Sequence, residues 1–173
     1  MDLKRTQIDD MEFLGAGITE KSTMNSLKRK VSYLESIHTK IQSLPTQIAV
    51  YLLRLSFGLP RFTYLFRTSP CFATSEMDEI SLCFKNLLTS LMNLNFTITV
   101  YEQACLPIKL GGLGFPVFSE VAVSAYLSSI FASEVICKRH LHNYSLVEFQ
   151  ATAYQFYATK LMNAGIPEKN QCQ

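Results

Sequence analysis

The feature that most constrains this chain is an apolar periodicity of three, four and seven residues in its first third. Six residues carry the pattern: Met24, Leu27, Val31, Leu34, Ile41 and Leu44. Because an α-helix turns once every ~3.6 residues, side chains at these spacings lie on one stripe of one helix. The pattern predicts a helix over 22–44, about 30 Å long, that buries this stripe against other helices.

The same helical spacing continues through the following segment. Pro45 suits the first turn of a second helix, and Gly58 suits the position just after its end. We expect one face of this helix to enter the core, formed by Ile48, Tyr51, Leu52 and Leu55. Leu59 and Pro60 predict a break. A short amphipathic segment then ends near Ser69 and carries Phe62, Leu65 and Phe66.

Two further helices are predicted between 75 and 139. Ser75 with Asp78 has the spacing of a capping box. The helix that it would open carries an apolar stripe of Ile80, Cys83, Phe84, Leu87, Leu88 and Leu91, before Asn93 and Asn95 end it. Ser119 is expected to cap a long helix that reaches about Arg139. Its residues available to the core are Val121, Ala125, Phe131, Ala132 and Val135.

A second capping box, Ser145 with Glu148, indicates a last helix that ends at Gly165.

Regular structure other than helix is predicted in few places. Only 11–18 and the approach to the glycines at 111–114 look extended, with a short segment near 98–105 between the helices. The fold class predicted is therefore all-α or mainly helical, a bundle with a short N-terminal β-hairpin or extended segment.

Composition supports a folded, intracellular protein. Apolar residues make up 48% and charged residues 17% of the 173 residues, enough apolar material for a buried core. No apolar stretch follows Lys4 and Arg5, so we expect no secretory signal, and the five cysteines are then free thiols in the cytoplasm or nucleus. The longest segment without a charged side chain, 86–101, is too short and too polar for a membrane span, and we expect no membrane partner.

Charge is unevenly distributed along the chain. The net charge of the whole chain is +2, but 21–74 holds eight basic residues and one acidic residue, a net +7, which leaves −5 for the remainder. Six of those basic residues are candidates for contacts with a nucleic-acid backbone: Lys28, Arg29, Lys30, Arg54, Arg61 and Arg67. Aromatic side chains interleave with them and could stack on bases: Tyr33, Tyr51, Phe57, Phe62, Tyr64 and Phe66. The alternative is a solvated polar face with the aromatic rings in the core.

Two motifs with catalytic or phosphate-binding residue types have ordinary structural explanations. Asp9 and Asp10 could form a metal-binding pair, but Glu12 is the only other acid nearby, and we interpret the pair as a solvated lead-in. The glycines at 111–114 lack the lysine of a P-loop. A tight turn that permits close backbone packing explains them better.

A third motif, Cys137 with His140 and His142, contains metal-binding residue types. Its spacing is not that of a zinc site, and cationic groups at a helix C-terminus explain it. We therefore predict no catalytic residue, no metal site and no cofactor in this chain.

Three segments in order resemble one family. They are FLGAGI at 13–18, LLRLSFGLPRFTYLFRTSP at 52–70 and LPIKLGGLGF at 106–115, the last followed by a helix of small residues at 122–133. They are similar to the region after the palm in reverse transcriptases of non-LTR (LINE-like) retroelements. The resemblance spans about 11–135, and its most specific part is the glycine-rich string.

This resemblance implies a thumb-like helical bundle. In such enzymes the hairpin helps to position the primer end, which here corresponds to Leu14, Gly15 and Ala16, and the thumb helices grip the template–primer duplex. The polymerase carboxylates belong to a palm strand well before the hairpin, and Asp9 and Asp10 stand too close to it. The resemblance therefore implies a non-catalytic piece of an RNA-directed DNA polymerase.

We therefore predict that the chain has three parts. Residues 1–20 form a hairpin-like lead-in, 21–74 form basic thumb-like helices, and 75–173 form an apolar post-thumb region. The expected partner is RNA or DNA, duplex or single strand, bound without sequence specificity. A palm domain or another helical protein is the other partner that we expect. The alternative function is a helical protein–protein interaction module with no nucleic-acid role.

Overall fold

The fold of this chain is mainly helical. The computed structural model describes residues 11–72 and 74–140, together with Gln155 and Thr159. Within that part, the strands β1 (Glu12–Phe13) and β2 (Ala16–Gly17) form a small antiparallel hairpin, and the other regular elements are helices. The predictions of a mainly all-α fold and of an extended segment near 11–18 are confirmed.

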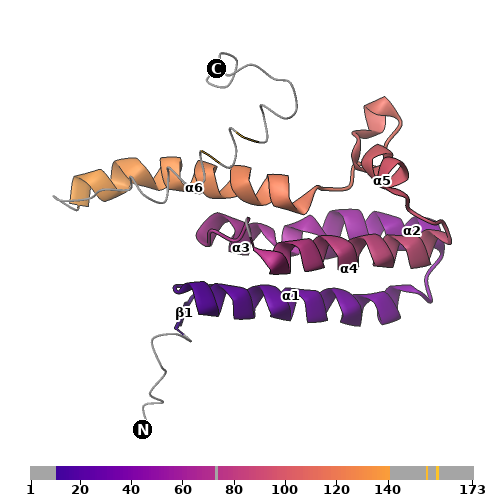
Figure 1. Cartoon of the computed structure of the whole chain (residues 1–173), viewed down its shortest axis with the longest axis horizontal. Coiled ribbons are helices and arrows are strands. Elements are labelled where there is room, and N and C mark those ends of the chain that lie inside the picture. The colour runs from indigo at the N-terminus through magenta and orange to yellow at the C-terminus, as the bar shows by residue number, and fades with distance from the viewer. Residues whose placement is uncertain (1–10, 73, 141–154, 156–158, 160–173) are drawn as a thin grey trace, which may run out of the picture.

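The helices are stacked in layers around α4 (Ser75–Met92) (Figure 1). Helix α1 (Glu20–Ile41) packs along one side of α4, and α6 (Phe118–His140) packs on the opposite side, against α4 and α3 (Thr63–Thr68). Helix α2 (Thr46–Leu52) contacts α4 within the middle layer. The C-terminal half of α6 extends beyond the other helices (Figure 1).

Helix α1 begins and ends earlier than the apolar pattern predicts. Thr19 and Ser22 form a reciprocal capping box, in which the Ser22 N–H donates to Thr19 Oγ1 at 3.2 Å and the Thr19 N–H donates to Ser22 Oγ at 3.0 Å. Most of the predicted stripe is buried: Leu27, Val31, Leu34 and Ile41. Leu44 lies beyond the end of the helix and is exposed, so its assignment to the stripe was wrong.

The helix after Pro45 presents a different face to the core from the one predicted. Pro45 is the N-cap residue, and α2 continues into the π-helical segment η2 (Leu53–Phe57), where the Gly58 N–H donates to the Leu53 carbonyl at 2.7 Å. Ala49 and Leu53 are buried. The predicted face was wrong, because Leu52 is only half-buried and three of its members are exposed: Ile48, Tyr51 and Leu55. Both faces of this segment are apolar, and periodicity alone does not say which one meets α4.

Gly58 ends this helix for a steric reason. Its φ of −82° is not left-handed, contrary to what a glycine just after a helix suggests. A Cβ at this position would lie 2.5 Å from the Leu53 carbonyl oxygen, so the close approach of the two backbones requires glycine.

Helix α4 buries the face that the sequence predicts but begins differently. Thr74 is its N-cap residue, and Ser75, the predicted cap, is already inside the helix, where its hydroxyl bonds to Glu76 Oε2 at 3.1 Å. Asn93 ends the helix in the left-handed conformation, as expected. The predicted stripe is buried or half-buried: Ile80, Cys83, Phe84, Leu87, Leu88 and Leu91.

Helix α6 is apolar on most of its circumference, and its core face also differs from the prediction. It begins at Phe118, so Ser119 does not cap it. The buried residues are Phe118, Ala122, Val123, Tyr126, Leu127 and Ile130. Of the predicted set, Val121 and Ala125 are half-buried, and three residues are exposed: Phe131, Ala132 and Val135.

Phenylalanine rings join the layers in the centre of the molecule. Phe118 of α6 stands edge-on to Phe62 and Phe84, with ring centroids 5.1 and 5.0 Å apart, and Phe84 also contacts Phe115 at 5.6 Å. Such pairs add to the free energy gained by burying the rings. Phe118 therefore holds α6 to both the middle layer and the segment before α3.

The glycine cluster forms a tight turn after α5 (Ile98–Cys105), as predicted. Gly111 and Gly114 have φ of +82° and +68°, and a Cβ on Gly112 would overlap the Leu106 carbonyl. The approach to the glycines is not extended, because it forms the 3₁₀ turn η4 (Ile108–Leu110).

Several predictions fall on residues outside the described part of the chain. These are the Asp9–Asp10 pair, His142, Cys172 and, apart from Gln155 and Thr159, the helix between Ser145 and Gly165. The division at 1–20, 21–74 and 75–173 stays a prediction.

Candidate nucleic-acid interface

Three of the predicted basic residues converge near the hairpin. Helix α1 carries Arg29 and Lys30, and the 3₁₀ turn η3 (Leu59–Arg61) carries Arg61. The Lys30 ammonium donates a hydrogen bond to the Arg61 carbonyl at 2.8 Å and lies 5.7 Å from the centroid of the buried Phe62 ring. These contacts fix the direction of the lysine side chain and hold its charge beside the two arginines.

The three cationic side chains of this cluster repel one another. Burial lowers the pKa of Lys30, and the charges of Arg61 and Arg29 lower that pKa further. Because the neighbouring positive charges disfavour the protonated amine, an anion placed here would be attracted to all three side chains and would raise the pKa of Lys30 again.

A groove of about 300 Å³ lies next to these residues, between the hairpin, α1 and α3. We call it the basic groove, and its lining includes Arg29, Lys30, Tyr33, Tyr64, Glu12 and Gly15. The Tyr33 hydroxyl is buried and has no hydrogen-bond partner among the described residues. An unpaired buried hydroxyl costs free energy, so this group is available to a ligand that enters the groove.

One acidic residue partly neutralises the groove. Glu12 of β1 accepts a hydrogen bond from the Arg29 guanidinium, which also donates to Ser26 Oγ at 2.8 Å. This ion pair ties the hairpin to α1 and leaves Lys30 with no carboxylate partner in the described structure.

The other basic candidates lie in different surroundings. Lys28 is 4.0 Å from the nearly buried carboxylate of Glu76, at the start of α4. The Arg54 guanidinium packs against the backbone of Gly114, where a Cβ would come within 3.3 Å of it. Arg67 is exposed on α3. The structure therefore gathers Arg29, Lys30 and Arg61, and their role and that of the other candidates stay predictions.

The hairpin presents its predicted residues at an exposed tip. Phe13 pairs with Ala16, and the loop residues Leu14 and Gly15 both have positive φ, 50° and 83°. Such a loop matches the right-handed twist of the strands. Leu14 is 79% exposed, whereas Ala16 is buried against the bundle.

The base of the hairpin is fixed by hydrogen bonds to two helical elements. The Gly17 carbonyl accepts from Thr23 Oγ1 on α1 and from Ser69 Oγ just after α3, each at 3.3 Å. A Cβ on Gly17 would overlap the Thr23 backbone, so this junction requires glycine. The position of the tip relative to Arg29 and Lys30 is therefore set by the core.

Of the aromatic residues proposed for stacking, the structure separates two groups. Phe62 and Phe66 belong to the core, whereas Tyr33 and Tyr64 line the basic groove. Three rings that lie close by were not among the residues proposed for stacking: Phe13, Phe72 and Tyr126. Tyr126 could have been found from its place on α6, but only if the buried side of that helix had been identified.

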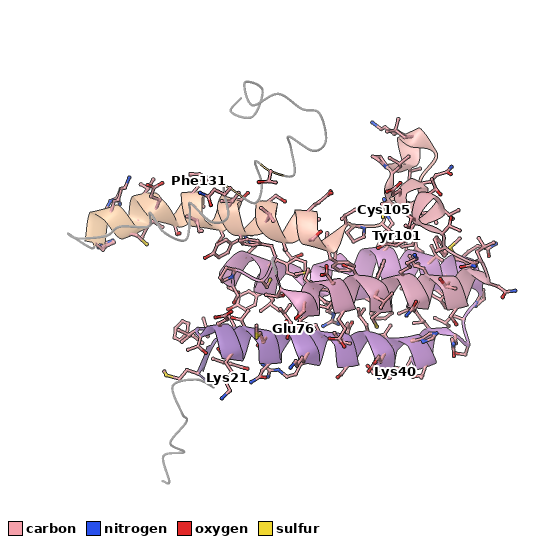
Figure 2. The ribbon with its side chains drawn as sticks, in the orientation of Figure 1. Lys21, Lys40, Glu76, Tyr101, Cys105 and Phe131 are labelled. Atoms are coloured by element: carbon pink, nitrogen blue, oxygen red, sulfur yellow. The ribbon has the colours of Figure 1, made fainter. Side chains whose placement is uncertain are left out.

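Potential metal ligands and cysteines are scattered over the part of the chain that the structure describes. That part contains no group of three His, Cys, Asp or Glu side chains placed to hold a metal ion. Its cysteines, Cys71, Cys83, Cys105 and Cys137, are free thiols. Tyr101 and Cys105 lie together in α5 (Figure 2), and burial raises the pKa of both groups.

One described helix is long and apolar enough to cross a membrane by length and composition. This is α6, with 23 residues, a mean hydropathy of 1.4 and 28% of the apolar window buried. Core helices of soluble proteins meet the same criterion, so it is weak evidence of a membrane span. The expectation of no membrane partner stays a prediction.

Comparisons with other proteins identify no relative. No family model, no curated protein and no solved structure matches the chain.

Proposed function

We propose that this chain binds the phosphate backbone of nucleic acid through the basic groove, without reading its sequence. The observation that supports this most directly is the convergence of Arg29, Lys30 and Arg61 beside a buried hydroxyl that has no partner. Cationic side chains provide affinity for phosphate, and a hydroxyl adds a directed hydrogen bond.

The resemblance to non-LTR reverse transcriptases suggests the setting of this activity. In that setting the chain is a non-catalytic, thumb-like part of an intracellular polymerase, and the tip at Leu14 and Gly15 contacts a primer end. The support is the hairpin beside the basic groove, which is the arrangement such a role needs. A palm domain would be its protein partner.

Binding should depend steeply on salt. Fluorescence anisotropy of a labelled RNA–DNA duplex gives the slope of log affinity against log salt, and Arg61→Gln should reduce that slope by about 1. Arg61 does not line the groove itself, but its charge is close enough to Lys30 of the groove to lower the pKa of that lysine. Its side chain is exposed, and only its backbone carbonyl holds Lys30. No binding at low salt contradicts the proposal.

The matched control is Lys40→Gln. Lys21 and Lys40 mark the two ends of α1 (Figure 2), and Lys40 is an exposed cation outside the basic groove. If Lys40→Gln reduces the salt slope as much as Arg61→Gln does, the binding is a general effect of positive charge rather than a property of the groove.

A second candidate function rests on the exposed apolar face of α2 and η2. Ile48, Tyr51 and Leu55 each expose about half of their surface or more. An apolar face of this kind suits a helical protein partner. Light scattering tests this second function. Self-association that Leu55→Ser abolishes would support a protein-binding face on α2 and η2. A molecular mass of one chain at all protein concentrations would argue against binding of a second copy through this face.

A further inference from the structure

A second, larger cavity lies on the other side of the hairpin from the basic groove. Its volume is about 810 Å³, within the range of ~300–1,000 Å³ usual for ligand sites. We call it the aromatic cavity, because four rings from four segments line it: Phe13 of β1, Tyr64 of α3, Phe72 of the loop that follows, and Tyr126 of α6.

The wall at Tyr126 carries a polar group suited to a ligand. The residue is only 9% exposed, and it lines the aromatic cavity from α6. Its ring lies 5.9 Å from that of Phe72. A tyrosine hydroxyl is protonated at neutral pH and able to donate, and burial raises the pKa of Tyr126 further.

The two sites are neighbours that share a residue. Tyr64 lines both, and the hairpin forms a wall of each, with Phe13 facing the aromatic cavity and Gly15 facing the basic groove. A ligand can therefore occupy both sites at once by passing Tyr64, which is 49% exposed.

Charge separates what each site can accept. Two cations, Arg29 and Lys30, and one acid, Glu12, line the basic groove and leave it net positive, whereas the described lining of the aromatic cavity includes no cation and one acid, Glu20. A phosphate is favoured in the groove and disfavoured next to Glu20. A neutral planar ring with hydrogen-bonding edges suits the aromatic cavity, because its faces stack on aromatic rings.

We propose that the aromatic cavity receives one unpaired base of a nucleic acid whose neighbouring phosphate lies in the basic groove. This inference rests on the proposed function and adds a preference to it. A base in a duplex is paired and stacked, so it must leave the duplex to enter the cavity. The chain therefore binds a single-stranded end or overhang in preference to a blunt duplex.

The test uses the full chain and three labelled DNAs in anisotropy titrations at fixed low salt. They are a blunt duplex, the same duplex with a short single-stranded overhang, and that duplex with abasic nucleotides in the overhang. The last keeps every phosphate and lacks only the bases. We expect the intact overhang to bind roughly tenfold more tightly than the abasic one, which is the usual scale for stacking one base.

Two variants assign the difference to the cavity. Phe13→Ser changes a ring that is 66% exposed and lines the aromatic cavity but not the basic groove. It should reduce the ratio between the affinities for the intact and the abasic overhang to about one. It should leave the affinity for the blunt duplex unchanged. The matched control is Tyr51→Ser, which removes a ring that is 62% exposed on α2 and lines neither site, and it should leave the preference unchanged.

The outcomes separate this inference from the proposed function. Equal affinities for the intact and abasic overhangs overturn the base site and leave phosphate binding standing. The base site is also overturned if Phe13→Ser and Tyr51→Ser change the preference for the intact overhang by the same amount. If none of the three DNAs binds, the proposed function fails and the base site fails with it.

Discussion

Cys71 is completely buried in the loop between α3 and α4, and its thiol illustrates how a single group links stability to pH. Burial raises the pKa of Cys71 from 9.0 to about 12. The unfolded chain releases this proton above pH 9, whereas the folded chain keeps it until about pH 12. The folded state therefore binds more protons in this window, and the free energy of unfolding falls as the pH rises through it.

This gives a prediction for Cys71→Ala. The variant should lose less stability than the wild type between pH 9 and pH 10.5, because alanine has no proton to retain. Urea unfolding followed by circular dichroism at several pH values measures the two slopes. Tyr101 and Tyr126 also have raised pKa values and stay in both proteins, so identical slopes would show that Cys71 is not responsible.

At the scale of elements, the turn after α5 depends on two adjacent glycines for different reasons. Gly111 has a φ of +82° and open space around its Cα, whereas a Cβ on Gly112 would overlap the carbonyl of Leu106. The first needs glycine for its backbone conformation and the second for close packing.

The two alanine substitutions should therefore differ in cost. Gly111→Ala should lower the free energy of unfolding by about 1 kcal/mol, the cost of a left-handed residue with a side chain. Gly112→Ala should lower it by roughly 3 kcal/mol, because backbone must move to admit the methyl group. Urea denaturation measures both, and a cost for Gly111→Ala equal to or above that for Gly112→Ala would contradict the account.

The elements also show what sequence reasoning can and cannot supply. The existence of α1 and α4 could be predicted, because one apolar stripe dominates each, and the segment 11–18 was expected to be extended or, from the resemblance, a hairpin. The buried faces of α2 and α6 could not be predicted, because apolar residues surround both helices and the neighbours decide which side is covered. Thr74 rather than Ser75 occupies the N-cap position of α4, and its hydroxyl donates to the Cys71 carbonyl instead of accepting from the helix, so the capping pattern placed the helix start one residue late.

The candidate site was predictable only in part, for a similar reason. Charge along the sequence indicated Arg29, Lys30 and Arg61, but only the crossing of α1 with η3 brings them together. Tyr33 and Tyr64 stood among several aromatic residues, and nothing local separated them from core rings such as Phe62. Long-range packing determines which of these side chains face a cavity.

At the scale of the whole molecule, the layers are joined through a small number of rings. Phe118 contacts rings from the segment before α3 and from α4, and it is only 1% exposed. Loss of this side chain leaves a cavity between three elements that cannot close without moving α6.

Phe118→Ala should therefore destabilise the fold as a unit. We expect a loss of about 3–5 kcal/mol in the free energy of unfolding, the usual cost of removing a buried phenylalanine. Leu82→Ala is the control, because Leu82 is an apolar residue of α4 that is 58% exposed, and it should cost under about 0.5 kcal/mol. Equal midpoints in urea for the two variants would show that Phe118 does not hold the layers together.

The anchored base of the hairpin has a consequence for how fast a ligand binds. Hydroxyls from α1 and from the residue after α3 hold the Gly17 carbonyl, so the tip does not have to be ordered when a ligand arrives. A site with little ordering to do loses little entropy on binding, and its association rate is governed by encounter and long-range attraction. We therefore expect fast, salt-sensitive association, with differences in affinity between ligands arising from how long each one stays.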